Sequence, residues 1–192
     1  MAYRLRPMRR EDIPQVSEID KACFPTMLPY TNYQTELINP MAHYLTVWDD
    51  TPLPPIGELP TEPLIPGFAG LWLLAGEAHV INIAVREEYR QEGLGELLLI
   101  GLVQKAQLLK ASMVTLEVRV SNTVAQHLYA RYGFTERGRR RAYYTDNRED
   151  AVIMTMDDPC SPAYEVVFQQ LRQRYEKKWR RTTEISKNRW AS

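Results

Sequence analysis

The chain has 192 residues, 44% of them hydrophobic, and its 24 Lys and Arg balance its 24 Asp and Glu. This size and composition predict one domain with a real core, or one domain with an appendage. The zero net charge gives no sign of a nucleic-acid or membrane-surface binder. Residues 68–76, the longest uncharged apolar stretch, fall far short of the ~20 residues that span a bilayer, and no signal-type region opens the chain, so we expect a cytoplasmic protein.

The charges are distributed unevenly along the chain. Residues 159–192 contain eight Lys and Arg against three Glu, which leaves residues 1–158 with 16 basic and 21 acidic residues. We therefore predict an acidic body, residues 1–158, and a basic tail, residues 159–192. Cys23 and Cys160 lack C-x-x-C spacing, which argues against a disulfide framework or a zinc site and favours inert thiols over a catalytic one.

The first part of the chain predicts strands and helices around a long loop. Residues 3–6 and 44–48 read as strands, and residues 10–24 have the apolar spacing of a helix. Thr31 is the expected N-cap of a short helix to Ile38. Residues 50–66 contain six prolines, so they should form a surface connection, either a passive insertion, which we favour, or a lid beside the substrate.

A hairpin and a glycine-bearing turn follow. Residues 68–75 and 77–85 are expected strands, and an apolar helix should run from Leu94 to about residue 110. The first N–H groups of a helix lack intrahelical partners and carry partial positive charge. Gly93 and Gly95 would let a ligand approach the backbone, and Arg90 could add a charge-assisted hydrogen bond. The turn is a candidate anion site, although an ordinary strand–turn–helix fits it equally.

The remaining elements complete an α/β pattern. Residues 113–120 alternate as a strand, Ser121-Asn122 should cap a short helix that ends at Gly133, and strands are expected from residue 134 and over 151–156, around a polar, basic hairpin at 137–147. Together with the earlier elements, this predicts a mixed, twisted sheet with helices on both faces.

The C-terminal tail predicts a separate helical unit over residues 161–181. One apolar stripe recurs every four residues and consists of Val167, Leu171, Tyr175 and Trp179. We favour docking of this stripe on the body. Self-association and contact with a ribosome or RNA are the alternatives.

Two runs of residues resemble one family. Arg90-x-x-Gly93-x-Gly95 resembles the acetyl-CoA pyrophosphate loop, R/Q-x-x-G-x-G/A, of the GNAT acetyltransferase superfamily. Residues 116–122, LEVRVSN, continued by Leu128-Tyr129 and Gly133-Phe134, are similar to the signature of its RimI-like N-terminal acetyltransferases. The resemblance covers about residues 77–156. On the substrate side, residues 29–31 read Pro-Tyr-Thr where the family has Pro-Trp-Ser.

The resemblance implies a GNAT fold over residues 1–158 and a C-terminal helical extension. It implies acetyl transfer from acetyl-CoA to the α-amine of a protein, with the N-terminal alanine of a small-subunit ribosomal protein as the leading candidate. It assigns the general base to Glu117 and the general acid to Tyr129. The implied cofactor contacts are Ile83, Ala84, Val85, Arg90, Gln91, Glu92, Gly93, Leu94, Gly95, Glu96 and Asn122. The acetyl-transfer chemistry requires no metal, and the composition gives no sign of a membrane partner.

The chemistry agrees with these roles. An α-amine has a pKa near 8, so about a tenth of it is unprotonated at pH 7, and a carboxylate such as Glu117 can take the proton from the rest. A tyrosine hydroxyl can protonate the leaving thiolate, and a backbone N–H near Val85 can stabilise the carbonyl oxygen. Arg119 should pair with a nearby carboxylate, with contact to the substrate as the alternative.

Other functions stay open at this point. A lysine ε-amine costs about 3.4 kcal/mol more to deprotonate, which disfavours lysine without excluding it. The alternatives are acetylation of a lysine or small polyamine, and a non-catalytic acetyl-CoA-binding module. Direct nucleic-acid binding is not favoured and would have to use the basic tail.

Overall fold

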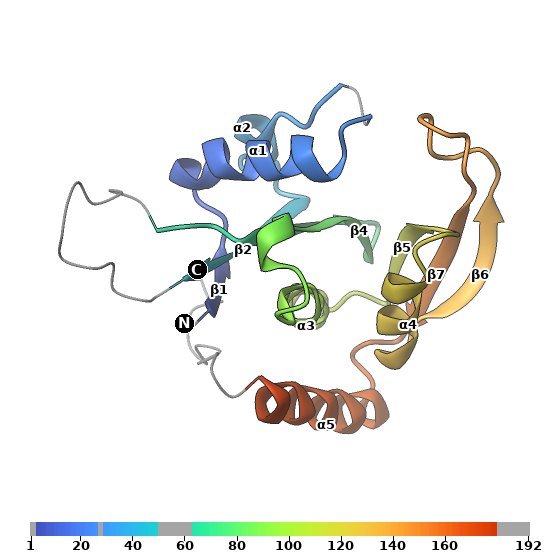
Figure 1. The fold of residues 1–192 in the computed structure, drawn as a ribbon. Coiled ribbons are helices and arrows are strands. Elements are labelled where there is room, and N and C mark those ends of the chain that lie inside the picture. The colour runs from blue at the N-terminus through green and yellow to red at the C-terminus, as the bar shows by residue number, and fades with distance from the viewer. Residues whose placement is uncertain (1–2, 27–28, 50–62, 180–192) are drawn as a thin grey trace.

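The computed structural model describes residues 3–26, 29–49 and 63–179 (Figure 1). Within them, seven strands form one sheet in the order β1-β2-β3-β4-β5-β7-β6. The strands are β1 (Tyr3–Pro7), β2 (Ala42–Asp49), β3 (Gly67–Leu74), β4 (Glu77–Val85), β5 (Met113–Arg119), β6 (Thr135–Arg140) and β7 (Ala151–Asp157). Among the described strands, the pairing of β4 with β5 is parallel and the other pairings are antiparallel. Most of the proline-rich segment and the end of the basic tail lie outside the described residues.

Helices cover both faces of the sheet, as Figure 1 shows. They are α1 (Ile13–Cys23), α2 (Tyr33–Glu36), α3 (Leu94–Leu108), α4 (Thr123–Arg131) and α5 (Pro162–Lys178), with 3-10 turns η1 (Arg10–Asp12) and η2 (Glu87–Tyr89). The face under α1 and α2 holds one apolar cluster, and α3 and α5 share a larger cluster with the opposite face. The predicted fold class, a mixed sheet flanked by helices, is confirmed.

Helix α3 is the centre of the larger cluster. Residues Leu97 to Val103 are buried without a break, so the helix contacts protein on all sides rather than along one stripe. A helix that is apolar all round belongs in the interior. Its N-terminal end, which carries the glycine turn, is thereby held in place by the core.

Two local expectations were wrong. The short helix α2 is capped by Asn32, whose side chain accepts a hydrogen bond from the Thr35 N–H, and not by Thr31. On α5, Val167 is 49% exposed, whereas Phe168 is buried beside Leu171 and Tyr175. A spacing of four residues drifts away from the 3.6-residue helical period, so the buried stripe passes through Phe168.

A bulge in β4 opens the sheet. Gly70 pairs with Asn82 and Leu71 with Val80, so Ile81 has no partner on β3. Pairing of β4 with β5 ends at the same level, with Val80 opposite Leu116. Bulges bend a strand and increase its twist. Beyond this point β4 continues to pair with β3, and β5 continues to pair with β7. The edges of β4 and β5 that face each other are therefore not paired with one another there.

Candidate active site

A cavity of about 520 Å³ opens where β4 and β5 separate. Its walls come from the end of α1, the bulged part of β4, the second half of β5, the start of α4 and the β6–β7 connection. The lining includes Cys23, Phe24, Ile81, Asn82, Ile83, Glu117, Arg119, Asn122, Tyr129, Tyr143, Tyr144, Asp146 and Glu149. Four of the residues implied by the family resemblance, Ile83, Glu117, Asn122 and Tyr129, therefore meet at one cavity.

The open edge of β4 offers backbone groups to a ligand. The Arg86 N–H donates to the Pro66 carbonyl on the β3 side. Polar groups of successive strand residues point to opposite edges, so those of Val85 and Ile83 face the unpaired edge and those of Ala84 face β3. The Val85 carbonyl accordingly lies 3.6 Å from the Cys23 Sγ. Of the three implied contacts on β4, Ile83 and Val85 are the ones whose backbone groups point toward the unpaired edge, and the Val85 carbonyl there accepts from the Cys23 thiol.

Glu117 lies on β5, opposite Ile153 of β7, with its side chain 21% exposed. Its Oε1 lies 3.1 Å from Nη2 of Arg140, a residue whose own side chain is 55% exposed. An ion pair with such an exposed partner is weak and easily exchanged. Glu117 can therefore turn from Arg140 to an incoming ammonium group.

Tyr129 reaches the same cavity from α4. Its ring packs against Phe134, with centroids 5.9 Å apart. Burial, together with the nearby Tyr144, raises the pKa of Tyr129 to about 12. The hydroxyl is therefore protonated throughout the neutral range, as a proton donor must be.

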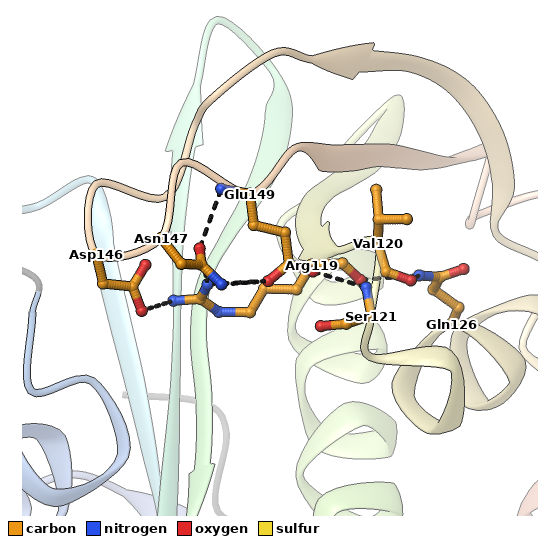
Figure 2. Close-up of polar contacts among 7 residues, drawn as sticks. All are labelled: Arg119, Val120, Ser121, Gln126, Asp146, Asn147 and Glu149. Atoms are coloured by element: carbon orange, nitrogen blue, oxygen red, sulfur yellow. Dashed lines mark hydrogen bonds and ion pairs between the residues drawn. The ribbon is translucent and has the colours of Figure 1, made fainter.

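Arg119 organises the wall opposite β4, and Figure 2 shows its contacts. Its guanidinium donates to Asp146 at 2.9 Å, Glu149 at 3.1 Å and Asn147 at 3.2 Å. It also lies 3.8 Å from the ring centroid of Tyr144. The expectation that Arg119 pairs with a carboxylate is confirmed.

The same network makes Glu149 a structural carboxylate. Its Oε1 accepts the Ser121 N–H at 2.7 Å, next to the cap of α4. Hydrogen bonds from Ser121, and then from Asn147 and Arg119, lower the pKa of Glu149 to about 2. The sequence did not predict this wall of the cavity, although the polar run Asp146-Asn147-Arg148-Glu149 could have indicated it. Among the cavity carboxylates, Asp146 and Glu149 are bound to Arg119, and Glu117 has the more exchangeable partner.

The glycine turn lies beyond the lining of this cavity, at the start of α3. Gly93 is the N-cap with φ of 81°, in the left-handed region, and Gln91 also has a positive φ of 66°. A Cβ on Gly95 would meet no atom of the described residues within 4 Å, so among them the face of the first turn at Gly95 is open. Leu94 is buried in the core and contributes only its backbone to that face. These features suit an anion that the first N–H groups of a helix could bind.

The acidic side chains of the turn, Glu92 and Glu96, each accept a hydrogen bond from a tyrosine. The Tyr3 hydroxyl donates to Glu92 at 2.6 Å, and the Tyr132 hydroxyl donates to Glu96 at 2.9 Å. Arg90 extends toward Cys23, with Nη2 4.0 Å from the sulfur. Asn122 caps α4, since its Oδ1 accepts from the Ala125 N–H at 3.1 Å, which leaves its amide NH₂ for a ligand.

In the part of the chain that the structure describes, His, Cys, Asp and Glu side chains form no group that could hold a metal ion. No helix among the described residues is long and apolar enough to cross a membrane. Both cysteines are free thiols.

Comparison with known proteins agrees with this geometry. A candidate ribosomal protein bS18-alanine N-acetyltransferase of Bacillus subtilis is 40% identical over 151 residues, which are 78% of this chain and 92% of that protein. An N-alpha-acetyltransferase of Sulfurisphaera tokodaii is 35% identical over 157 residues, 79% of this chain and 91% of that protein. The crystal structure of the Escherichia coli ribosomal-protein-S18-alanine N-acetyltransferase superposes with a TM-score of 0.64 at 27% identity, covering 81% of this chain and 93% of that one. The profile of the acetyltransferase (GNAT) family matches residues 13–134. A sheet parted at a bulge, a glycine turn on the central helix and these relatives lead to one conclusion: the chain belongs to the GNAT acetyltransferase family.

Proposed function

We propose that this protein transfers the acetyl group of acetyl-CoA to the N-terminal α-amine of a protein, in the cytoplasm. The observation that carries the proposal is the meeting of Glu117 and Tyr129 at one cavity beside the open edge of β4. The leading candidate for the acceptor is the N-terminal alanine of a small-subunit ribosomal protein. Relatives named for acetylation of the bS18 alanine, and one named N-alpha-acetyltransferase, support that choice.

The residues present fit the cosubstrate. The open edge at Ile83 and Val85 would pair with an extended, amide-bearing chain such as pantetheine, and the first turn of α3, from Gly93 to Glu96, would bind the pyrophosphate. Arg90, which lies beside Cys23, and the Asn122 NH₂ at the cavity are further candidate donors to the cosubstrate. When bound, acetyl-CoA supplies a thioester, an acyl group that an unprotonated amine can attack.

The side chains then divide the proton transfers. Glu117 accepts the proton of the acceptor amine, directly or through a water, after exchanging its contact with Arg140. Tyr129, protonated at neutral pH, gives a proton to the departing sulfur. The Val85 N–H on the open edge can stabilise the carbonyl oxygen as it gains charge. Arg119 binds Asp146 and Glu149 and so holds the opposite wall in place. Because these two carboxylates are paired with Arg119, they do not compete with Glu117 for the amine.

Acetylation of peptides with varied first residues tests the proposal. We expect acetyl-CoA-dependent transfer to the α-amine of an Ala-initiated peptide, and much slower transfer to a matched peptide whose α-amine is blocked and whose only amine is a lysine. Mass spectrometry after fragmentation locates the acetyl group. Preferred modification of lysine or spermidine would favour the runner-up, a lysine or polyamine acetyltransferase. Binding of acetyl-CoA without turnover on any amine would favour a non-catalytic binding module.

Tyr129→Phe should lower the transfer rate by about 10²-fold, the low end of the usual contribution of a general acid, because a thiolate is a tolerable leaving group even without the proton. The phenylalanine ring should keep the packing on Phe134. With a pKa of about 12, wild-type Tyr129 stays protonated below about pH 11, so its deprotonation should cause no loss of rate between pH 7 and 10. The deficit of the variant should therefore stay constant over that range in a pH–rate profile. A deficit that disappears at pH 9 would contradict the proton-donor role.

A further inference from the structure

Helix α5 is anchored along its length to the rest of the fold. At its start, Gln107 of α3 donates to Glu165 at 3.0 Å, and the Tyr164 hydroxyl donates to the Tyr132 carbonyl at 2.8 Å. Further along, Phe168, Leu171 and Tyr175 are buried in the cluster centred on α3. These contacts determine where the C-terminal end of α5 lies, which is beside the N-terminal end of α3.

At that end, Trp179 packs directly on the glycine turn. A Cβ on Gly93 would lie 2.5 Å from Cε2 and 2.7 Å from Nε1 of Trp179, so the indole occupies the space of a side chain at this position. The ring lies next to Tyr175, with centroids 6.5 Å apart. The indole Nε1 is buried and has no hydrogen-bond partner among the described residues, so packing holds the ring in place.

Trp179 supports the turn together with Tyr3 and Tyr132. Tyr3 holds the Glu92 side chain and Tyr132 holds Glu96, while Trp179 covers the backbone of Gly93 between them. Around Gly95, by contrast, the backbone faces open space. The turn is thus supported by side chains at Glu92, Gly93 and Glu96 and left free at Gly95, where a ligand would approach.

We propose that Trp179 is a positioning residue for the pyrophosphate of the cosubstrate, which rests on the function proposed above. The N–H groups of residues 94–96 can bind an anion well only if the N-cap holds them in one orientation. Gly93 is in the left-handed region and has no side chain to restrain it. The indole restrains it from outside, so less ordering free energy is lost when the anion binds. The α5 extension thereby acts on cofactor affinity and not on the chemical step.

The test measures CoA binding by calorimetry and amide hydrogen exchange of residues 91–96 without ligand. Trp179→Ala should weaken CoA binding roughly 3- to 10-fold and speed exchange in the turn. Trp179→Phe should recover part of both, because an aromatic ring still covers Gly93. In the turnover assay, kcat/KM for acetyl-CoA should fall because KM rises, while kcat stays nearly unchanged. With acetylpantetheine, which lacks the pyrophosphate, the loss should be much smaller.

The matched control is Phe168→Leu, which removes buried ring atoms from the same helix without touching Gly93. It should lower the melting temperature, yet change CoA affinity less than twofold. Equal CoA affinities for wild type and Trp179→Ala would contradict the proposal alone. So would equal losses for Trp179→Ala and Phe168→Leu, or equal losses with acetyl-CoA and acetylpantetheine. Failure of the wild type to bind CoA would instead contradict the proposed function.

Discussion

Glu117→Gln is expected to lower the rate of acetyl transfer by about 10²–10⁴-fold, the usual contribution of a positioned general base. The amide has nearly the shape of the carboxylate but cannot take the proton of the acceptor amine. Raising the pH from 7 to 9 should restore part of the rate, because more of the amine is then unprotonated without help. The measurement is the transfer rate to an Ala-initiated peptide across this pH range.

The control for Glu117 is Glu136→Gln on β6. Glu136 pairs with Arg139 at 2.9 Å, much as Glu117 pairs with Arg140, but it does not line the cavity. Both variants lose an Arg–Glu ion pair, and only Glu117→Gln should lose activity. Melting temperature and CoA affinity are measured on the same samples. A Glu117→Gln protein that is stable, binds CoA and transfers acetyl at the wild-type rate would rule out the base.

Gly95→Val should weaken CoA binding by roughly 10- to 100-fold, about the loss of one charge-assisted hydrogen bond. In the described part of the chain, a Cβ at this position meets nothing within 4 Å, so the variant should fold with little change in melting temperature. The branched side chain would then stand where the pyrophosphate approaches the first N–H groups of α3. Calorimetry with CoA and thermal melting, measured together, test the two halves of this prediction.

Gly138→Val on β6 is the control for Gly95→Val, since a Cβ there would make only an ordinary contact with Ile153, at 3.9 Å. Its CoA affinity should match that of the wild type. Gly93→Val is a useful contrast, because a side chain at residue 93 would collide with Trp179 and strain a positive φ. It should lose stability as well as affinity. If Gly95→Val binds CoA as tightly as the wild type, the pyrophosphate does not sit on this turn.

Local sequence patterns determined most of the elements and the candidate site residues. Alternation on β5 and helical spacing on α1 and α3 predicted those elements, because these periods depend only on near neighbours. The spacing of Arg90, Gly93 and Gly95, and that of Glu117, Asn122 and Tyr129, carried the resemblance to the family. The roles of Glu117 and Tyr129 are still predictions, and the experiments above address them.

The tertiary structure decided which of these residues meet. The parting of β4 from β5 depends on a pairing that joins Val80 to Leu116, and the bulge at Ile81 depends on how β4 pairs with β3; no local period encodes either pairing. The contacts of Arg119 with Asp146 and Glu149, and of Trp179 with Gly93, likewise join distant segments. The burial of Phe168 rather than Val167 depends on which side of α5 packs against α3. Sequence spacing determines which face a side chain occupies, whereas its partner depends on how the packed elements come together.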